Sequence, residues 1–257
     1  MRRYIFLLRE LVKRDFQSRY AGSVLGFVWS LVQPLWMLVL FTFVFSTVMK
    51  ITPGVGARTG HFAIFLFGGL LPWTAMHEGV LRSATAITDN ASLVKKLRFP
   101  SEILVVAVVL AALLHEAIAA VIFLGALLWV GELSWGRLPL LLLAVPLQVG
   151  LTLGIALVVA ALHVFFRDTA QVLGMVLNVW FYVTPIVYPL AQVPGSFRPW
   201  LALNPLTALV GLYRGAFFGG ELSGVAATAS LAVTAAVLLC AGLWIFHSLK
   251  PAFVDEI

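Results

Sequence analysis

The chain has 257 residues, of which 61% are hydrophobic and 11% are charged, and its mean hydropathy is +1.03. Soluble domains are roughly 45–50% apolar and about 25% charged. A soluble fold of this size cannot hide so much apolar surface from water, so the composition excludes a soluble enzyme and requires lipid as part of the solvent. Long apolar runs with little strand-like alternation favour membrane-spanning helices over an outer-membrane barrel.

The charge balance is basic, because 17 Lys and Arg residues against 11 Asp and Glu residues give a formal net charge of +6. The single cysteine, Cys240, excludes an internal disulfide and a cysteine-rich metal site. The five histidines are scattered, so we expect no bound metal. The first twenty residues hold six Lys or Arg residues and no short apolar segment before a cleavage site, so we expect no cleavable signal peptide.

Residues 1–20 predict an amphipathic helix that lies along the membrane surface. One arc, about 140° wide at 100° per residue, carries Tyr4, Ile5, Leu8, Leu11, Val12 and Phe16. Basic residues occupy the opposite side, and Leu7 and Asp15 are among the residues that interrupt the pattern. The helix is either a simple membrane anchor or a docking surface for a cytoplasmic partner, to which Arg14 would belong.

Six apolar stretches of about 20 residues or more predict helices that cross the membrane. They lie near residues 24–49, 61–83, 101–131, 138–165, 169–188 and 223–248. The region 189–219 is also apolar but is interrupted by several prolines and glycines. It predicts two short helices that dip into the outer side of the membrane without crossing it, as a re-entrant hairpin. The expected fold is therefore an all-α integral membrane domain spanning residues 1–257.

Six crossings place both termini on one side of the membrane. Assigning that side to the cytoplasm gathers 12 of the 17 Lys and Arg residues there and leaves 5 outside, Arg214 among them. This asymmetry favours cytoplasmic termini by the positive-inside rule.

Four ionisable residues fall inside the predicted spans. Glu78 and Arg82 are one helical turn apart in the second span and predict an ion pair. His115 and Glu116 lie in the third span, where a charge is costly unless it is paired or faces water. These residues either line a hydrated path that contacts substrate or form structural pairs between helices.

Several local strings, in the same order along nearly the whole chain, resemble those of one protein family. They are Arg-Tyr-Ala-Gly-Ser-Val-Leu-Gly-Phe-Val-Trp at 19–29 with Gln-Pro at 33–34, Phe-Gly-Gly-Leu-Leu-Pro-Trp at 67–73, Phe-Phe-Arg-Asp at 165–168, Thr-Pro-Ile-Val-Tyr-Pro at 184–189, Val-Pro at 193–194 and Asn-Pro at 204–205. The family comprises the permease subunits of polysaccharide-exporting ABC transporters of the ABC-2 type. Its members export O-antigen, capsular polysaccharide or teichoic acid, and the string at 184–189 is most similar to the O-antigen branch.

The resemblance implies a transport subunit of the bacterial inner membrane rather than an enzyme. Two copies of the permease would form a pathway for a lipid-linked polysaccharide, and two copies of a separate cytoplasmic ATPase would bind ATP and magnesium and drive it. The chain itself contains no Gly-x-x-x-x-Gly-Lys-[Ser/Thr] phosphate loop, so we expect it to bind no cofactor. The outer region 189–219 would form the gate through which the polymer leaves.

Residues 91–100, between the second and third spans, suit the coupling helix that the family places there. Pro100 ends the segment, and the residues that would contact the ATPase are Leu93, Lys95, Lys96, Leu97, Arg98 and Phe99. An ordinary basic loop would also account for the three cations by the positive-inside rule.

Aromatic faces suit a sugar polymer because C–H surfaces of sugars pack on rings and tolerate sliding. Trp29 and Trp36 are two helical turns apart and share a face of the first span. The other candidates for the channel are Trp73, Phe181, Tyr182 and Tyr188. Tryptophan and tyrosine also gather at membrane interfaces in any protein of this class, so a belt or packing role stays open.

Other functions fit the sequence less well. A membrane-embedded transferase needs an interfacial base, and the predicted cytoplasmic loops offer only Asp89 and Asp168. A passive channel favours rings of charge or filter carbonyls. Small-hydrophobe export stays open as a less favoured alternative. The charge of +6 is explained by topology and a docking face, without nucleic acid as a partner.

Overall fold

The computed structural model describes residues 2–18, 28–50, 59–96, 100–220, 222 and 224–257. All regular secondary structure in these ranges is helical. The α-helices are α1 Arg2–Ser18, α2 Trp29–Phe41, α3 Phe62–Ala84, α4 Ala91–Lys96, α5 Glu102–Val130, α6 Leu141–Phe165, α7 Thr169–Val183, α8 Arg198–Leu203, α9 Pro205–Phe218, α10 Val225–Leu249 and α11 Phe253–Glu256. The shorter elements are η2 Thr42–Val48, a π-helical continuation of α2, and the 3₁₀ turns η3 Thr88–Asn90, η4 Trp135–Leu140, η5 Leu190–Gln192 and η6 Lys250–Ala252.

Four helical segments of the described chain are long and apolar enough to cross a membrane. They are Phe62–Ala84, Glu102–Val130, Trp135–Phe165 and Val225–Glu256, and two shorter apolar helices lie at Trp29–Phe45 and Thr169–Val183. The six apolar stretches predicted from the sequence therefore all contain helices, and the all-helical prediction is confirmed.

The helix expected over 169–188 is shorter than predicted, because α7 ends at Val183. Thr184 precedes Pro185 and has φ −91° and ψ 137°, an extended conformation. A residue before proline is disfavoured in the helical region by clash with the proline ring, and proline offers no N–H to continue the helix. The chain therefore leaves the helix before the predicted end.

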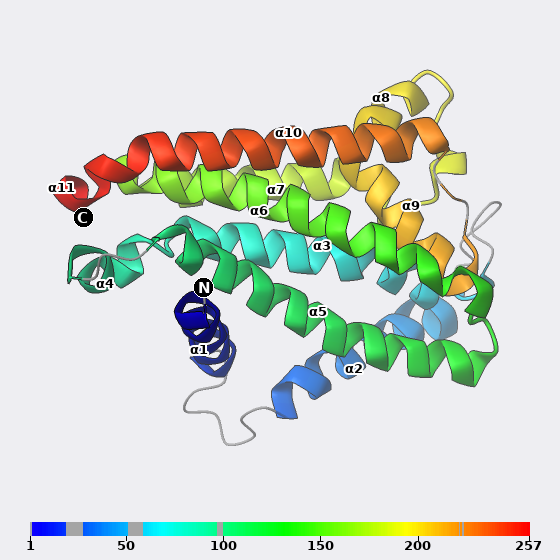
Figure 1. Cartoon of the computed structure of the whole chain (residues 1–257). Coiled ribbons are helices and arrows are strands. Elements are labelled where there is room, and N and C mark those ends of the chain that lie inside the picture. Colours follow the sequence, from blue (N-terminus) through cyan, green and yellow to red (C-terminus); the bar gives the residue numbers. More distant parts are fainter. Residues whose placement is uncertain (1, 19–27, 51–58, 97–99, 221, 223) are drawn as a thin grey trace.

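Helix α3 lies at the centre of the bundle (Figure 1). Most of its residues are buried, and it packs against α5, α6, α7 and α9. By contrast, α10 lies at the edge, and most of its residues are exposed or half-buried. Both helices are apolar. The apolar side chains of α3 contact other helices, whereas many of those on α10 remain exposed and can face lipid.

Helices α6 and α10 run side by side and approach closely at two glycines (Figure 1). A Cβ atom at Gly154 would lie 2.5 Å from the carbonyl carbon of Leu238, and one at Gly242 would clash with the backbone of Gly154. Only glycine permits this backbone contact, which is the small-residue packing used where no hydrophobic force drives helices together in lipid.

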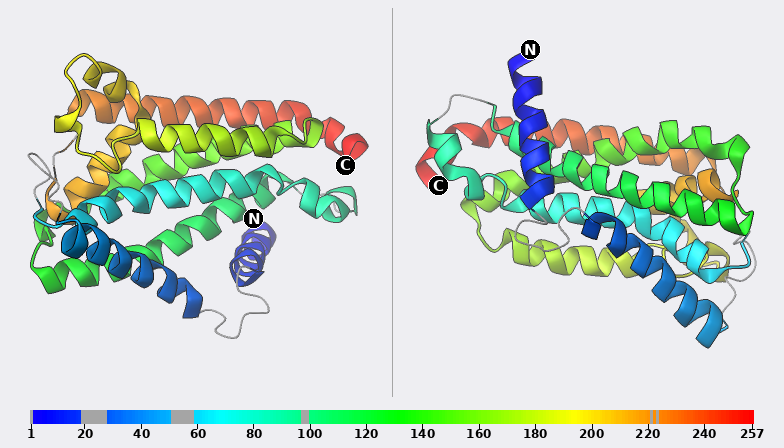
Figure 2. Two further views of the ribbon diagram at one scale, coloured as in Figure 1. Left: turned by 180° about the vertical axis from the view of Figure 1, so that it is seen from behind. Right: turned by 90° about the horizontal axis from the view of Figure 1, so that it is seen from below.

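Helix α1 crosses the long helices instead of running along them (Figure 2). Leu11 is buried, and Leu7, Leu8 and Val12 are half-buried against a cluster that includes residues of α5, α6 and α10. The side of α1 facing the protein therefore includes Leu7, which was expected to interrupt the apolar arc, whereas Ile5, an expected member of that arc, is 64% exposed. Packing on α5 rotates the helix from the orientation expected for lipid contact alone.

The elements between the long helices gather at opposite ends of the bundle (Figure 1). At one end lie α4 and the C-terminal α11, and at the other lie α8, the end of α9 and the turn after α5. The predicted cytoplasmic segment 91–100 and the C-terminus thus share one end, here called the inner end. Region 189–219 contains η5, α8 and α9 near the opposite, outer end.

Candidate functional site

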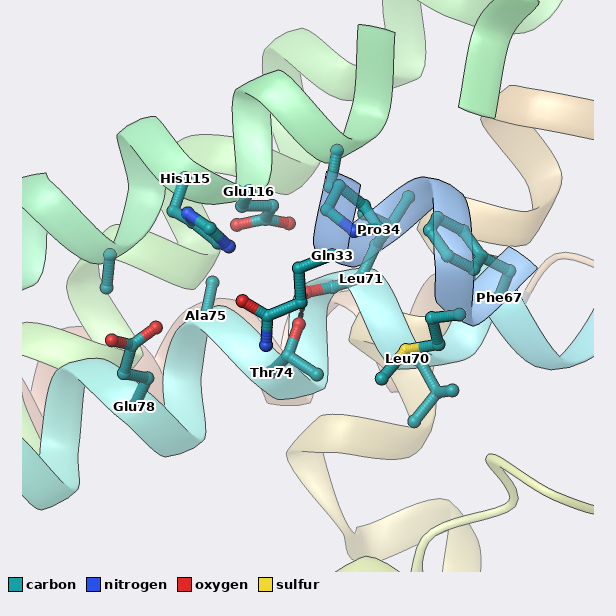
Figure 3. A pocket seen from close by; sticks show the side chains of 13 residues that line it. Gln33, Pro34, Phe67, Leu70, Leu71, Thr74, Ala75, Glu78, His115 and Glu116 are labelled. Carbon is teal, nitrogen blue, oxygen red and sulfur yellow. Dashed lines mark hydrogen bonds between the residues drawn. The ribbon is translucent and has the colours of Figure 1, made fainter. Parts of the chain in front are cut away.

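A pocket with a mostly apolar lining and five polar side chains lies between α2, α3 and α5 (Figure 3). Its volume is about 110 Å³. It is lined by Gln33, Pro34, Met37, Phe67, Leu70, Leu71, Thr74, Ala75, Glu78, Ala112, His115, Glu116 and Ala119. Three of the four ionisable residues singled out within the predicted spans therefore meet at one cavity, although they come from two helices.

Glu116 is the buried end of a hydrogen-bond chain behind this pocket. Its side chain is 6% exposed, and its Oε2 accepts a 2.6 Å hydrogen bond from Nε2 of Gln148 on α6. The Gln148 Oε1 in turn accepts from the hydroxyl of Tyr213 on α9, and Gln148 Nε2 also lies 3.4 Å from the carbonyl oxygen of Pro72. The carboxyl is therefore held through one oxygen, while Oε1 of Glu116 has no hydrogen-bond partner among the described residues.

Arg82 is the fourth of these ionisable residues, and it points to α1 rather than into the pocket lining. It donates two hydrogen bonds of 2.9 and 2.7 Å to the carboxylate of Asp15, a bidentate pair. The expected contact with Glu78 is also present, at 3.7 Å. Asp15 was missed as a partner, because on a surface helix it looked like an interruption of the apolar arc. An acidic residue in the middle of a protein-facing arc is the signal that identifies it.

The inner end joins α1 to the segment that precedes α4. Nη2 of Arg14 donates a 2.8 Å hydrogen bond to Oδ1 of Asn90, directly before the first residue of α4. In α4 the side chain of Leu93 is half-buried and that of Lys95 is exposed, while Lys96 ends the helix. Leu97, Arg98 and Phe99 lie outside the described residues. The described helix, Ala91–Lys96, lies within the predicted segment 91–100.

The C-terminal segment is tied to the same end of the bundle. Nζ of Lys250 lies 2.8 Å from Oε2 of Glu102 at the start of α5, and His247 Nε2 lies 3.6 Å from the other carboxylate oxygen. These contacts fix the end of α10 beside α5.

The six aromatic candidates divide into two groups. Trp73 on α3 is buried, with its ring centroid 5.4 Å from that of Phe181 on α7. Phe181 makes an edge contact with Tyr182 at 5.1 Å, and the Tyr188 hydroxyl donates to the carbonyl oxygen of Tyr182. This group links α3 to the end of α7.

The second aromatic group is formed by Trp29 and Trp36 on α2. Their side chains are 42% and 64% exposed in the single chain. Tyr182 is similarly open, at 69%. Three of the six aromatic candidates, on α2 and α7, are therefore exposed on the surface of the single chain, whereas Trp73 is buried within it.

Arg214 on α9, one of the five cations assigned to the outer side, is buried at the outer end of α3. Its guanidinium donates to the carbonyl oxygens of Phe65, Pro185 and Ile186, at 3.1, 2.8 and 2.6 Å. Its Cζ also lies 3.6 Å from the centre of the Phe65 ring. Buried charge is tolerated when hydrogen bonds replace water, and here they connect α3, α9 and the segment after α7.

The two glycines of the Phe-Gly-Gly string make room for this contact. A Cβ atom at Gly69 would lie 2.7 Å from Nη2 of Arg214, and one at Gly68 would lie 2.8 Å from the Phe218 ring. The two glycines of this string therefore allow α9 to pack closely against α3.

A second set of polar contacts holds the turn between α7 and α9. The indole N–H of Trp180 donates to Oδ1 of Asn204, whose Nδ2 donates to Oγ1 of Thr184, each at 2.9 Å. Asn204 also caps α9 by accepting from the backbone N–H of Leu206. The asparagine of the Asn-Pro string thus starts α9 and fixes it to α7.

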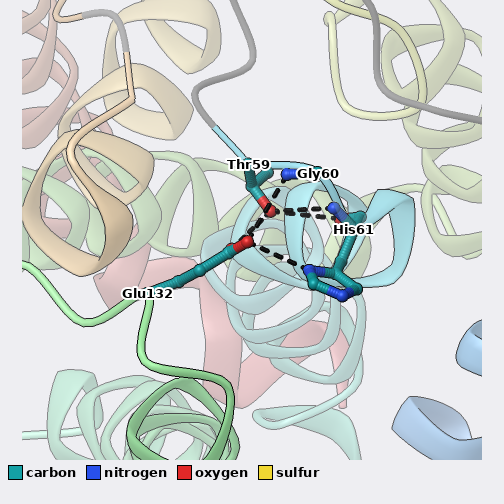
Figure 4. A network of polar contacts seen from close by, with 4 residues as sticks. All are labelled: Thr59, Gly60, His61 and Glu132. Atoms are coloured by element: carbon teal, nitrogen blue, oxygen red, sulfur yellow. Dashed lines mark hydrogen bonds and ion pairs between the residues drawn. The ribbon is translucent and has the colours of Figure 1, made fainter.

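A further polar network closes the outer end between the residues before α3 and those after α5 (Figure 4). Glu132 accepts a 2.5 Å hydrogen bond from the Thr59 hydroxyl and a 3.4 Å contact from the backbone N–H of Gly60, and it lies 3.0 Å from Nδ1 of His61. His61 is half exposed, so the network is accessible to solvent. Among the described residues no group of three or more His, Cys, Asp or Glu side chains is arranged to hold a metal ion.

The chain is similar to known proteins over almost its whole length. Residues 7–218 match the protein family described as ABC-2 type transporter. The chain is 32% identical to the O-antigen export system permease protein RfbA of Myxococcus xanthus over 256 residues, covering 99% of this chain and 96% of the relative. It is 30% identical to the RfbA protein of Klebsiella pneumoniae over 257 residues, covering 98% and 95%. It is 26% identical to the polysialic acid transport protein KpsM of Escherichia coli over 250 residues, covering 96% and 94%.

Proposed function

This chain belongs to the ABC-2 type transporter family, and from that premise we propose that it is the membrane-spanning subunit of an ATP-driven exporter of lipid-linked polysaccharide. The observation that carries the proposal is similarity along almost the whole chain to permeases named for O-antigen export and polysialic acid transport. O-antigen is the proposed cargo, because the relatives with that name are the more similar ones. Capsular polysaccharide is the second candidate, favoured by the similarity to KpsM.

The proposed topology has six crossings in the bacterial inner membrane, with both termini in the cytoplasm. The four long helical segments supply four crossings, and α2 with η2 and α7 supply the other two. The placement of α4 and α11 at one end of the bundle supports this arrangement. Region 189–219 would form the re-entrant outer gate, which the Arg214 contacts with Pro185 and Ile186 would hold in place.

The energy source in this proposal is a separate cytoplasmic ATPase, present in two copies, that binds ATP and magnesium. Its docking surface would be the inner end, where α1 and the segment before α4 are joined by Arg14 and Asn90. Lys95 is exposed beside the half-buried Leu93, which gives this surface both charge and an apolar contact. Leu97, Arg98 and Phe99 would extend it.

The pathway in this proposal lies between two copies of the chain. Each copy exposes apolar side chains on α2 and α7, among them Trp29, Trp36 and Tyr182. An apolar surface of this kind serves either lipid or a second helix surface. A pathway between copies would use these rings as a sliding surface for sugar, with Tyr188 and Phe181 supporting Tyr182.

The experiment that tests the function is reconstitution of the chain with the ATPase encoded beside it. We expect a stable complex with two copies of each subunit, and ATP-dependent movement of a lipid-linked O-antigen across proteoliposome membranes. Leu93→Asp is expected to lower ATP hydrolysis by the complex, whereas Leu142→Asn on the exposed side of α6 serves as the control. A chain that never associates with an ATPase and moves no polymer would refute the proposal.

A further inference from the structure

The inner end of α3 is joined to α1 by a contact that fixes both the distance and the orientation of the two helices. Nη1 and Nη2 of Arg82 donate to the two carboxylate oxygens of Asp15 at 2.9 and 2.7 Å. The side chains of Arg82 and Asp15 are 33% and 17% exposed, so water screens the pair only in part. A bidentate pair is directional, whereas the apolar packing of Leu8 and Leu11 on the same side of α1 is not. The pair therefore determines how α1 lies on the bundle.

The residue next to Asp15 joins α1 to the segment that precedes α4. Arg14 donates to Oδ1 of Asn90 at 2.8 Å, and Nδ2 of Asn90 donates to the carbonyl oxygen of Ala86 at 2.9 Å. Successive residues of a helix point about 100° apart, so Arg14 and Asp15 reach two different segments from one turn of α1. Side-chain hydrogen bonds therefore hold together α1, the end of α3 and the turn that follows α3.

Helix α3 connects this inner contact to the outer end of the molecule. Arg82 lies near the last residue of α3, and Phe65, whose carbonyl oxygen accepts from Arg214, lies in the first turn. At about 1.5 Å per residue the two positions are roughly 26 Å apart along the helix. Most of α3 is buried against other helices, and close-packed interiors transmit strain. A displacement at Arg82 therefore reaches both the pocket beside α3 and the Arg214 contacts.

Helix α1 offers a route from the proposed ATPase surface to α3. That surface comprises α1, the segment before α4 and α4 itself, and α4 packs against η3. In contrast, α1 packs against α5 and is bonded to α3 through Asp15 and Arg82. Apolar contacts allow a helix to slide or rotate, so the ion pair is the contact through which a displaced α1 pulls α3 with it.

We propose that Arg82 is a positioning residue for transport, which passes displacements of α1 to α3 through its bidentate contact with Asp15. This inference rests on the proposed function, because it takes an ATPase docked at the inner end as the source of the displacement. Glu78, which lies 3.7 Å from Arg82 and lines the pocket, connects the same guanidinium to the pocket wall. Without the pair, ATP hydrolysis continues while less polymer moves for each ATP consumed.

The test measures polymer export and ATP hydrolysis in the same proteoliposomes, which contain the full chain, the ATPase encoded beside it and a lipid-linked O-antigen. The quantity compared is the polymer exported per ATP hydrolysed, for equal amounts of assembled complex. We expect Arg82→Gln and Asp15→Asn each to lower this ratio about fivefold, while ATP hydrolysis stays within about twofold of the native rate. A role in folding alone would lower both activities together and leave the ratio unchanged.

Matched control variants make the same chemical changes at exposed positions. Glu10→Gln converts a carboxylate to an amide on the outward side of α1, and Arg167→Gln removes a guanidinium from the turn between α6 and α7. We expect both controls to keep the native ratio. A comparable loss in either control would show that the ratio responds to any change of charge, and would overturn the assignment to Arg82.

A second comparison tests whether Arg82 and Asp15 act through each other. Asp15 takes part in a further interaction, and a double-mutant cycle cancels contacts outside the pair. We expect the double variant Asp15→Asn/Arg82→Gln to lower the ratio roughly fivefold, as one single variant does, instead of the roughly 25-fold loss of independent effects. Reversal of both charges, Asp15→Arg with Arg82→Asp, is expected to export more polymer per ATP than either reversal alone.

Several results would overturn the positioning role. They are an unchanged ratio in Arg82→Gln, failure of both neutral single variants to assemble, a double variant whose loss is the product of the single losses, and an assembled double reversal that exports no better than either single reversal. Where the reversed chains do not assemble, the cycle of neutral variants decides. A native complex that hydrolyses ATP without moving polymer would instead refute the proposed function, and this inference with it, so the two failures are distinguishable.

Discussion

Arg214 and Glu116 are both buried polar residues packed near the central helix α3, and they differ in how completely their hydrogen bonds are satisfied. Arg214 donates to three backbone carbonyls and lies over the Phe65 ring. Glu116 accepts one hydrogen bond from Gln148 through Oε2, while its Oε1 has no partner among the described residues. The first arrangement connects three segments of the chain, and the second connects α5 to α6 through one carboxyl oxygen. Burial alone therefore does not distinguish the two residues, whereas the number of their hydrogen-bonded atoms does.

The largest effect is expected when the fully hydrogen-bonded group, the Arg214 guanidinium, is removed. Arg214→Met leaves the carbonyls of Pro185 and Ile186 without donors in a buried place, so we expect the protein to lose about 3 kcal/mol or more of stability. Thermal unfolding in detergent measures the loss. Arg198→Met is the matched control, because Arg198 also donates to two carbonyls but is exposed. Water can replace its bonds, so a control as damaging as Arg214→Met would contradict the argument.

Substitution of Gly69, which lies against the Arg214 guanidinium, is expected to be nearly as destabilising. Gly69→Ala places a Cβ atom 2.7 Å from Nη2 of Arg214, and we expect a loss of about 2 kcal/mol through the forced displacement of the guanidinium. Gly125→Ala on α5 meets nothing within 4 Å, and removal of a helical glycine is expected to leave stability unchanged or raise it by up to about 1 kcal/mol. Unfolding midpoints of the two variants, measured side by side, decide the point.

The partly satisfied network is expected to respond less. Gln148→Leu removes the donor to Glu116 and the acceptor for Tyr213, and we expect a loss of about 1–2 kcal/mol. The exposed Gln171→Leu on α7 serves as control, with an expected change within about 0.5 kcal/mol. If Gln148→Leu is as harmless as its control, Glu116 does not depend on Gln148 and the contrast with Arg214 is weaker than stated.

The smallest effect is expected at the ion pair between α1 and α3. Asp15→Asn weakens a bidentate contact with Arg82, and because both side chains are partly exposed, we expect a loss of about 1 kcal/mol or less. The change is best detected as faster proteolysis of α1. Glu10→Gln alters the same charge on the exposed side of α1, and equal proteolysis of the two variants would show that Asp15 does not hold the helix.

Most helix positions were predictable because the signal is local. The segments near 61–83, 101–131 and 223–248 agree within two residues with α3, α5 and the main part of α10, since hydropathy along the chain decides which residues enter lipid. The end of α7 was misplaced by five residues, because an apolar sequence continued past the Thr184–Pro185 break.

The candidate site was predictable only in part. Glu78, His115 and Glu116 were selected from the sequence by the cost of charge in a membrane, and they do line one pocket. Their partners were not predictable, because Gln148 and Tyr213 lie on other helices and carry no charge that marks them. The burial of Arg214 was also not predictable, since a cation counted for topology carries no sign of the carbonyl oxygens that it binds.

The sequence by itself determined that lipid is a solvent for this chain, where its helices form and which family it resembles, because those properties depend on composition and on short strings. Only the tertiary structure decided which buried groups meet. Phe65 and Arg214 are 149 residues apart, and Asp15 and Arg82 are 67 apart. Whether a buried polar group has all its hydrogen bonds satisfied depends on the atoms within about 3 Å of it, and only helix packing brings those atoms together.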